Sequence, residues 1–262
     1  MTIANTLRKT VLFQFRRVAH LFGYELVRTR RKLNRPVGEY QVVLPAATYS
    51  PWIADDAFNR AFSAVQSHTM VDRYRCYELW DLVAQAAKRP GAFIEVGVWR
   101  GGSGLLMAQR LTQLGFARTI YLCDTFRGLV KTGPTDYASD GMHSDTSAES
   151  VRRLASSLSL ENVIVHEGIF PDDTADRIPE DKVAFCHVDV DVRRSAEDVI
   201  GWIWPRLVVG GIVVFDDYGF GGSIGLTKGV TGLTSLVNEM KMENDRVFVH
   251  NLNGHGILVK TR

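Results

Sequence analysis

The segment that most constrains the fold runs from residue 92 to residue 111. An apolar run, 92–94, ends in the acid Glu95, and a turn rich in glycine then leads into a stretch of helical composition. Strand, glycine turn and helix in this order are typical of an open α/β sheet whose backbone a ligand approaches closely. Trp99 and Arg100 interrupt the turn, so the dinucleotide spacing G-x-G-x-x-G is absent. An acid at the strand end would repel a phosphate and suits a cationic or hydroxylated ligand.

Length and composition are consistent with one large α/β domain that carries an extension. The chain has 262 residues, of which 45% are hydrophobic and 23% are charged, ordinary values for a globular protein. No run of 18 apolar residues is present, so no transmembrane helix is expected. Three widely spaced cysteines in apolar surroundings indicate core thiols in a reducing compartment rather than disulfides or a zinc site. We therefore expect a cytoplasmic protein.

Charge is unevenly distributed along the chain. Residues 1–35 contain nine Lys or Arg and one acid, a net charge of +8, whereas the remainder carries −6. Apolar residues alternate with these bases, so we expect a helical arm. It either makes peripheral contact with an anionic membrane or packs on the following domain or on a second subunit of a homo-oligomer. The arm lacks the h-region of a secretory signal. The acidic remainder offers no face for nucleic acid.

Alternating strand and helix patterns predict the fold class. Five apolar strand candidates, most of them separated by helical stretches, predict a parallel, doubly wound α/β sheet with right-handed crossovers. The last two strand candidates flank Asn253-Gly254, a hairpin signal, so the mostly parallel sheet should end in an antiparallel pair. The strand candidates are 92–98, 119–123, 162–166, 183–190, 211–215, 246–250 and 256–259; the helix candidates are 71–87, 103–114, 146–158, 194–205 and a stretch near 233–241.

The region ahead of the first helix candidate contains several prolines. Pro36, Pro45 and Pro51 punctuate residues 36–65, which we therefore expect to be irregular. This expectation divides the chain into a basic helical arm with an irregular segment, 1–60, and one domain, 61–262.

Acids stand where four of the predicted strands end. Asp124 follows the second strand, where a carboxylate can accept two hydrogen bonds from a ribose diol or cap a turn. Asp189 lies near the end of the fourth strand candidate, and Asp216 and Asp217 follow the fifth. Three carboxylates that converge without a Lys or Arg partner repel one another, and a divalent cation relieves that cost. Oxygen ligands favour Mg²⁺ or Ca²⁺, and an incomplete protein set favours Mg²⁺.

Several neighbouring residues leave alternatives open. The acids could instead cap helices or pair with Arg193 and Arg194. His187 lies in an apolar strand, where it either assists the chemistry or is a core residue. The polar loop 128–146 is long enough to be a mobile cover, and His143 lies within it.

Three groups of residues resemble the macrocin O-methyltransferase family (the TylF/MycF and NovP group). Members of this family use S-adenosylmethionine (SAM) and Mg²⁺ to methylate sugar hydroxyls of natural products. The resemblance covers roughly residues 60–262 and implies a class I SAM-methyltransferase, Rossmann-like fold. The segments are 69–71; 95–103 with 124–129; and 187–191 with 205–218, the last reading Pro-x-Leu-x-x-Gly-Gly, four residues, then Asp-Asp-Tyr.

The resemblance also implies roles for individual residues. It implies a Mg²⁺ site on Asp189, Asp216 and Asp217, with Asp191 as general base, and a small-molecule or glycan substrate with neighbouring hydroxyls. Arg193 stands where the family often has tyrosine, a departure that bears on the substrate. The rival interpretations are a nicotinamide-dependent oxidoreductase and a catalytically silent SAM-fold binding module. The residues implied to bind SAM are Thr69, Glu95, Gly97, Gly101, Ser103 and Asp124.

Overall fold

A computed structural model of the chain describes most of the sequence. The described residues are 18, 21–22, 47–134, 136, 138–219 and 232–262. The chain divides into two compact units, residues 1–43 and residues 44–262, and the second contains the sheet. The basic arm expected at 1–35 lies, apart from three residues, outside the described residues. Among the described helices, none has both the length and the apolar character needed to span a bilayer.

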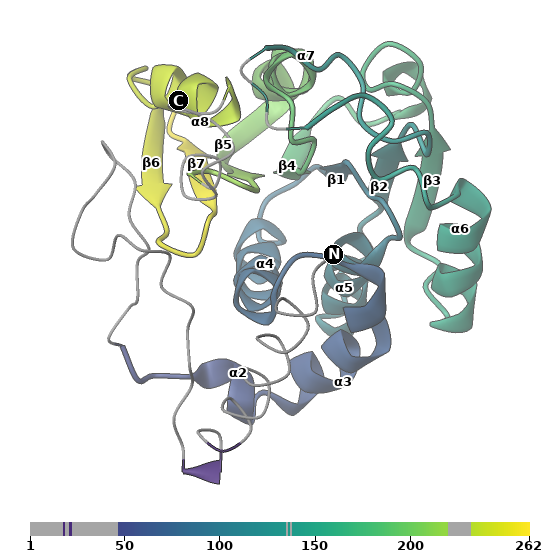
Figure 1. The fold of residues 1–262 in the computed structure, drawn as a ribbon. Helices are drawn as coiled ribbons and strands as arrows, with labels where there is room; N and C mark the ends of the chain where they lie inside the picture. The colour runs from purple at the N-terminus through teal and green to yellow at the C-terminus, as the bar shows by residue number, and fades with distance from the viewer. Residues whose placement is uncertain (1–17, 19–20, 23–46, 135, 137, 220–231) are drawn as a thin grey trace, which may run out of the picture. The chain divides into compact units, whose positions relative to one another are not determined.

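A seven-stranded sheet forms the centre of the second unit (Figure 1). The first five strands run parallel, and β7 and β6 add an antiparallel pair at one edge, in the order β3-β2-β1-β4-β5-β7-β6. Both the parallel doubly wound sheet and the C-terminal hairpin are confirmed. The strands are β1 (Ala92–Val96), β2 (Ile120–Asp124), β3 (Val163–Glu167), β4 (Val183–Val188), β5 (Leu207–Phe215), β6 (Arg246–His250) and β7 (Gly256–Lys260).

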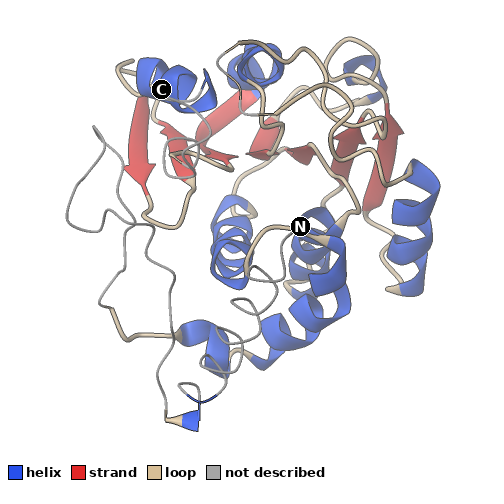
Figure 2. Ribbon diagram, in the orientation of Figure 1, coloured by secondary structure: helices blue, strands red, loops and turns tan. Residues whose placement is uncertain are grey.

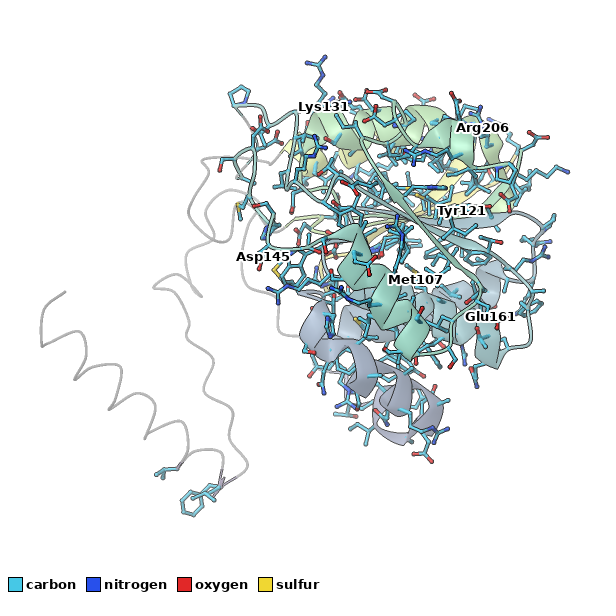
Figure 3. All side chains as sticks on the ribbon, turned by 90° about the vertical axis from the view of Figure 1, so that its right-hand side faces the viewer. Met107, Tyr121, Lys131, Asp145, Glu161 and Arg206 are labelled. Atoms are coloured by element: carbon cyan, nitrogen blue, oxygen red, sulfur yellow. The ribbon has the colours of Figure 1, made fainter. Side chains whose placement is uncertain are left out.

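Helices cover both faces of this sheet (Figure 2). One hydrophobic cluster joins one face to four helices, and a second joins the other face to two helices and a 3₁₀ turn. Met107 and Tyr121 mark these buried layers among the side chains of Figure 3. On the first face lie α3 (Asp56–Val65), α4 (Arg73–Ala86), α5 (Gly102–Gln113) and α6 (Ala148–Ser157); on the second lie η2 (Ala175–Arg177), α7 (Arg193–Arg206) and α8 (Gly232–Met240).

The expectation of an irregular segment at residues 36–65 is wrong for its second half. Residues 51–65 form α2 (Pro51–Ala54) and α3, followed by η1 (Gln66–His68). Pro51 occupies the first turn of α2, a position where proline starts a helix rather than breaking one. Asp55 then caps α3 by accepting a hydrogen bond from the Phe58 N–H at 2.9 Å. The expected boundary after residue 60 therefore falls inside a helix of the sheet-containing unit.

Two further details of the sheet differ from the sequence-based prediction. β4 ends at Val188, two residues earlier than expected, so the acids that follow lie beyond the strand. β5 begins at Leu207, four residues earlier than expected, and pairs irregularly with β4 near its start. The three cysteines are buried and unbridged, as expected for core thiols.

Candidate active site

The glycine turn after β1 is shaped by the close approach of two strand ends. Gly97 has φ +87°, and a Cβ atom there would lie 1.8 Å from the backbone oxygen of Asp189. No residue with a side chain fits that space. The turn therefore needs glycine at this position because the ends of β1 and β4 converge there, and the glycine turn lies directly against the backbone of Asp189.

Asp124, at the end of β2, holds this turn in place. Its Oδ2 accepts hydrogen bonds from the backbone N–H groups of Val98 and Trp99, at 2.6 and 2.8 Å. Its Oδ1 accepts another from the Phe126 N–H at 2.6 Å. These bonds stabilise Trp99 in a left-handed conformation, φ +46°, that a bulky residue rarely adopts. Asp124 therefore caps the turn.

Glu95 lies beneath the turn rather than at its surface. The side chain is fully buried, and its Oε1 lies 2.9 Å from Nδ1 of His187 on the neighbouring strand β4. Its Oε2 has no hydrogen-bond partner among the described residues. A Cβ atom at Gly104 would lie 2.4 Å from that oxygen, so the acid runs under the first turn of α5.

A cavity that is partly open to solvent lies beyond the carboxyl ends of the parallel strands. Gly97 and Asp124 line it from one side, and Asp189 and Asp191 line it from the other. Cys123 and Val199 contribute to its apolar wall. The remaining lining residues are Met70, Val96, Trp99, Thr125, Gly128, Leu129, Val130, His143, Gly168, Ile169, Phe170, Val190 and Ser195.

Four residues expected at the cofactor do not line this cavity. Glu95 is buried as described above. Thr69 accepts a hydrogen bond from the Val71 N–H at 3.0 Å, and so forms a turn ahead of α4. Gly101 is the left-handed N-cap of α5, and Ser103 is buried in the first turn of that helix. The structure therefore places these four residues around the glycine turn and the start of α5, and not on the surface of the cavity.

Three acids form a cluster at the acidic side of the cavity. Carboxylate oxygens of Asp189, Asp191 and Asp217 lie within 4.8 Å of one another. Asp191 and Asp217 have φ values of +59° and +56°, a strained conformation that aspartate tolerates better than most residues. Burial, and then the neighbouring carboxylates, raise the pKa of Asp189 and of Asp217 well above its ordinary value. A hard divalent cation suits such a set of oxygens.

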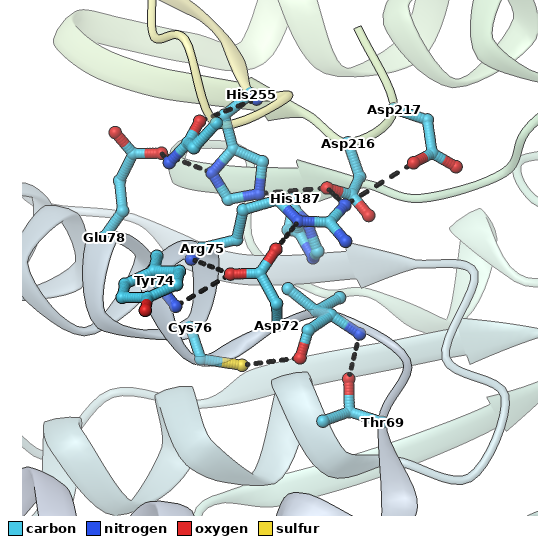
Figure 4. Close-up of polar contacts among 12 residues, drawn as sticks. Thr69, Asp72, Tyr74, Arg75, Cys76, Glu78, His187, Asp216, Asp217 and His255 are labelled. Atoms are coloured by element: carbon cyan, nitrogen blue, oxygen red, sulfur yellow. Dashed lines mark hydrogen bonds and ion pairs between the residues drawn. The ribbon is translucent and has the colours of Figure 1, made fainter. Parts of the chain in front are cut away.

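Asp216 belongs to a different, buried group, although it is adjacent to Asp217 in the chain. Its Oδ1 lies 2.5 Å from a guanidinium nitrogen of Arg75 and 3.0 Å from Nε2 of His255 (Figure 4). Burial alone would raise the pKa of Asp216, but His255 and Arg75 lower it below its ordinary value. The expectation that the acids at β4 and β5 lack an arginine partner is therefore wrong, because α4 supplies Arg75.

The buried group extends to the hairpin. His255 donates from Nδ1 to Glu78 of α4 at 2.5 Å, and its ring lies 5.9 Å from that of His187. Ligand atoms of His187, Asp216 and His255 lie within 4.8 Å of one another. Sequence reasoning missed Arg75, Glu78 and His255. No local motif indicates them, since Arg75 and Glu78 lie on an ordinary helix and His255 is part of a turn signal.

The loop after β2 covers one side of the cavity. His143, which lines the cavity, lies with its ring edge-on to Trp99 at 6.5 Å. Asp145 accepts hydrogen bonds from Trp99 Nε1 at 2.8 Å and from Arg100 at 2.5 Å. Figure 3 shows Asp145 at the surface of the unit. On the opposite side Lys131 contacts Asp198 of α7 at 2.6 Å, so the loop is tied down at two points.

Among the described residues, the side chain of Arg193 forms its ion pairs with two glutamates instead of with the acids of the cavity. It forms two hydrogen bonds with Glu239 of α8, at 2.9 and 2.8 Å, and one with Glu197, at 2.7 Å. The residue that stands in place of the family's tyrosine therefore links α7 to α8.

The strand order and the cavity at the strand ends define the class of protein. The fold is that of the class I SAM-dependent methyltransferases, as the resemblance implied. The chain belongs to the macrocin-O-methyltransferase (TylF) family, whose model matches residues 54–230.

Two relatives and one solved structure illustrate this similarity. The chain is 33% identical over 165 residues to demethyldecarbamoylnovobiocin O-methyltransferase of Streptomyces niveus, covering 58% of this chain and 63% of the relative. It is 29% identical over 170 residues to mycinamicin III 3''-O-methyltransferase of Micromonospora griseorubida, covering 58% and 65%. The structure of the O-methyltransferase NovP aligns with a TM-score of 0.62 and 28% identity, covering 74% of this chain and 83% of NovP. The match thus spans somewhat less than two thirds of these two relatives.

Proposed function

We propose that this protein is a SAM-dependent O-methyltransferase. The observation that carries the proposal is that one cavity is lined both by Gly97 of the glycine turn and Asp124 at the end of β2, and by the acids Asp189 and Asp191. A donor bound on the turn would lie next to an acceptor bound at the acids, as methyl transfer requires. Membership of the TylF family supports the same reaction.

The cofactor would lie along the turn. Asp124 is the candidate acceptor for the ribose hydroxyls, and the backbone at Gly97 allows close approach. Thr69, Glu95, Gly101 and Ser103 would act indirectly, by holding the turn in shape. Trp99 and His143 add aromatic surface to the same wall of the cavity.

Asp189, Asp216 and Asp217 would hold a Mg²⁺ ion, with Asp191 next to them. The carboxylates of Asp189, Asp191 and Asp217 lie within 4.8 Å of one another, and the pKa values of Asp189 and Asp217 are raised, which supports a divalent cation there. Asp216, the third expected ligand, lies outside this set and contacts Arg75 and His255. When bound, the ion would lower the pKa of two neighbouring acceptor hydroxyls and fix their position.

Asp191 would act as the general base. In this transfer the acceptor oxygen would form a bond to the methyl carbon of SAM as the carbon–sulfur bond breaks, and the sulfur would keep the electron pair. Asp191 takes the hydroxyl proton, so S-adenosylhomocysteine and a methyl ether are formed. Alignment of donor and acceptor by the two walls of the cavity contributes about 7–11 kcal/mol.

The acceptor would be a sugar hydroxyl of a glycoside, natural product or glycan with a second hydroxyl beside it. By their names, the two relatives reported above are O-methyltransferases of demethyldecarbamoylnovobiocin and of mycinamicin III. The basic residues 1–35 suit either an anionic membrane, which would favour a lipid-linked acceptor, or a second subunit of a cytoplasmic homo-oligomer.

Isothermal titration with SAM and with NAD, each with and without Mg²⁺, tests the proposal. We expect SAM to bind in both conditions and NAD in neither. Methyl transfer from labelled SAM to a panel of glycosides should then require Mg²⁺. Binding of NAD in place of SAM would support an oxidoreductase instead. SAM binding with no transfer to any acceptor, in the presence of Mg²⁺, would indicate a binding module.

A further inference from the structure

Arg75 is a buried arginine that reaches the acidic site from outside the sheet. Its side chain is 9% exposed, and its NH1 lies 2.5 Å from Asp216 Oδ1 and 3.5 Å from Asp217 Oδ1. Its Nε lies 2.8 Å from Asp72, the N-cap residue of α4. Figure 4 shows the guanidinium between these acids. One side chain therefore joins the start of α4 to both acids that follow β5.

The anchoring at Asp72 fixes the direction of this guanidinium. Asp72 Oδ1 accepts hydrogen bonds from the N–H groups of Tyr74 and Arg75, at 2.8 and 3.2 Å, while Oδ2 faces Arg75 Nε. The same carboxylate thus caps the helix and orients the arginine. Because the guanidinium is planar and rigid, fixing Nε also fixes where NH1 points.

The charges around the site explain why an arginine belongs there. Asp189, Asp191, Asp216 and Asp217 bring four carboxylates to one strand edge, and buried like charges are costly without compensation. A divalent cation compensates them while it is bound, and Arg75 supplies a full positive charge at all times. The arginine and the cation therefore compete for the same two acids.

We infer that Arg75 is an internal counter-ion of the metal site: it positions Asp216 and Asp217 and weakens the site's affinity for the divalent cation. This inference rests on the metal site proposed above. The role is one of positioning, since Arg75 acts through the two aspartates. It predicts opposite effects on two measurable quantities when the charge is removed. The affinity for the cation should rise, and turnover at saturating cation should fall.

The experiment compares variants by isothermal titration with Mg²⁺, by Mn²⁺ binding followed by electron paramagnetic resonance, and by turnover with saturating SAM and Mg²⁺. Arg75→Met should bind Mg²⁺ roughly tenfold more tightly, the lower end of what one neighbouring charge does to a carboxylate equilibrium. Its turnover should fall at least about tenfold, because Asp216 loses its anchor. Arg75→Lys keeps the charge and loses the fork, so its Mg²⁺ affinity should stay within about twofold while turnover falls.

Two more variants keep the test decisive. Asp72→Asn retains a good N-cap but weakens the hold on Arg75, so it should tighten Mg²⁺ binding by about two- to threefold. It decides the matter if Arg75→Met does not fold. Arg153→Met removes an arginine from an exposed i,i+4 pair with Glu149 on α6 and should change neither quantity.

The outcomes separate this inference from the proposed function. Weaker or unchanged Mg²⁺ binding in a folded Arg75→Met protein would overturn the counter-ion role and leave the metal site standing. If Arg75→Met does not fold, unchanged Mg²⁺ binding in Asp72→Asn has the same consequence. Absence of Mg²⁺ and Mn²⁺ binding in the wild-type protein, with SAM still bound, would overturn both the inference and the metal dependence.

Discussion

Two clusters of ionisable side chains meet at the carboxyl ends of β4 and β5, and they have opposite surroundings. Carboxylates of Asp189, Asp191 and Asp217 lie within 4.8 Å of one another, all three residues are half-buried, and Asp189 and Asp191 line the cavity. Asp216 lies on the other side of the strand end, buried, and contacts Arg75 and His255. In the first cluster, burial and then the neighbouring carboxylates raise the pKa values of Asp189 and Asp217, whereas in the second His255 and Arg75 lower the pKa of Asp216 against the effect of burial.

The different surroundings of Asp216 and Asp217 arise from packing, because the two side chains are chemically identical. Successive residues at the end of a strand point to opposite sides, so the side chains of Asp216 and Asp217 have different neighbours. Asp216 then meets α4 and the β6–β7 turn, which carry a base each. Asp217 lies near the carboxylates of Asp189 and Asp191, with the guanidinium of Arg75 3.5 Å away. Adjacent aspartates therefore acquire pKa values shifted in opposite directions from the ordinary value.

The largest expected effect concerns the cavity cluster. Asp189→Ala should abolish methyl transfer while SAM affinity stays within a few-fold. The reason is that Asp189 is proposed to hold the metal, whereas the glycine turn after β1 and Asp124 are proposed to hold the cofactor. Single-turnover assays and SAM titration measure the two effects. Asp181→Ala, at an exposed position ahead of β4, is the matched control. Loss of SAM binding in a folded Asp189→Ala protein would show that metal binding and cofactor binding are not assigned to separate walls of the cavity.

The next effect is on the general base. Asp191→Asn keeps the size of the side chain and removes its basicity, so turnover should fall on the order of 10²–10⁴-fold. Mg²⁺ and SAM binding should both persist, and so should the melting temperature. A pH profile of turnover at saturating substrate checks the assignment. A near-normal rate across neutral pH would mean that another group accepts the proton.

How well the sequence predicted each cluster follows from the range of the contacts. The parallel sheet and the C-terminal hairpin depend on local patterns, and both lie where they were expected. The strand-end acids were also found from local patterns, but their partners were not. Arg75 contacts Asp216 from 141 positions away, and His255 contacts Glu78 from 177. Neither partner carries a motif, so only the folded sheet brings them together. For the same reason, the sequence pattern of an apolar strand ending in an acid did not predict that Glu95 would be buried against His187 of the neighbouring strand.

The buried cluster should affect stability more than the cavity cluster does. His255→Gln leaves Glu78 and Asp216 without the imidazole that bridges them, at a cost of about 2 kcal/mol for the lost bonds to charged groups. For a protein of this size that corresponds to a fall in melting temperature of roughly 4–8 °C. Differential scanning calorimetry measures it, with Asp191→Asn as the comparison. Equal melting temperatures for the two variants would remove this distinction between the buried cluster and the cavity cluster.

The smallest expected effect concerns a histidine whose neighbours are cations instead of acids. His166, near the end of β3, is buried and stacks on Tyr121 at 5.6 Å. Burial first, and then the positive charges of Arg177 and Arg152, lower its pKa below the ordinary 6.5. His255 has the opposite shift: burial would lower its pKa, but its bonds to Asp216 and Glu78 raise it. The pKa values of the two histidines are thus shifted in opposite directions, as are those of Asp216 and Asp217.

The sign of the pH dependence follows from the direction of the shift at His166. Above pH 6.5 the ring is neutral in both the folded and the unfolded chain, so it contributes no pH dependence. As the pH falls below 6.5, the unfolded chain takes up a proton that the folded protein still resists, and folding stability decreases. His166→Gln should therefore melt less pH-dependently than the wild-type protein between about pH 5 and 6.5 and in parallel with it above pH 7. Melting curves across this range, in buffers of constant ionic strength, measure the difference. Parallel curves throughout would mean that His166 is protonated equally easily in both states.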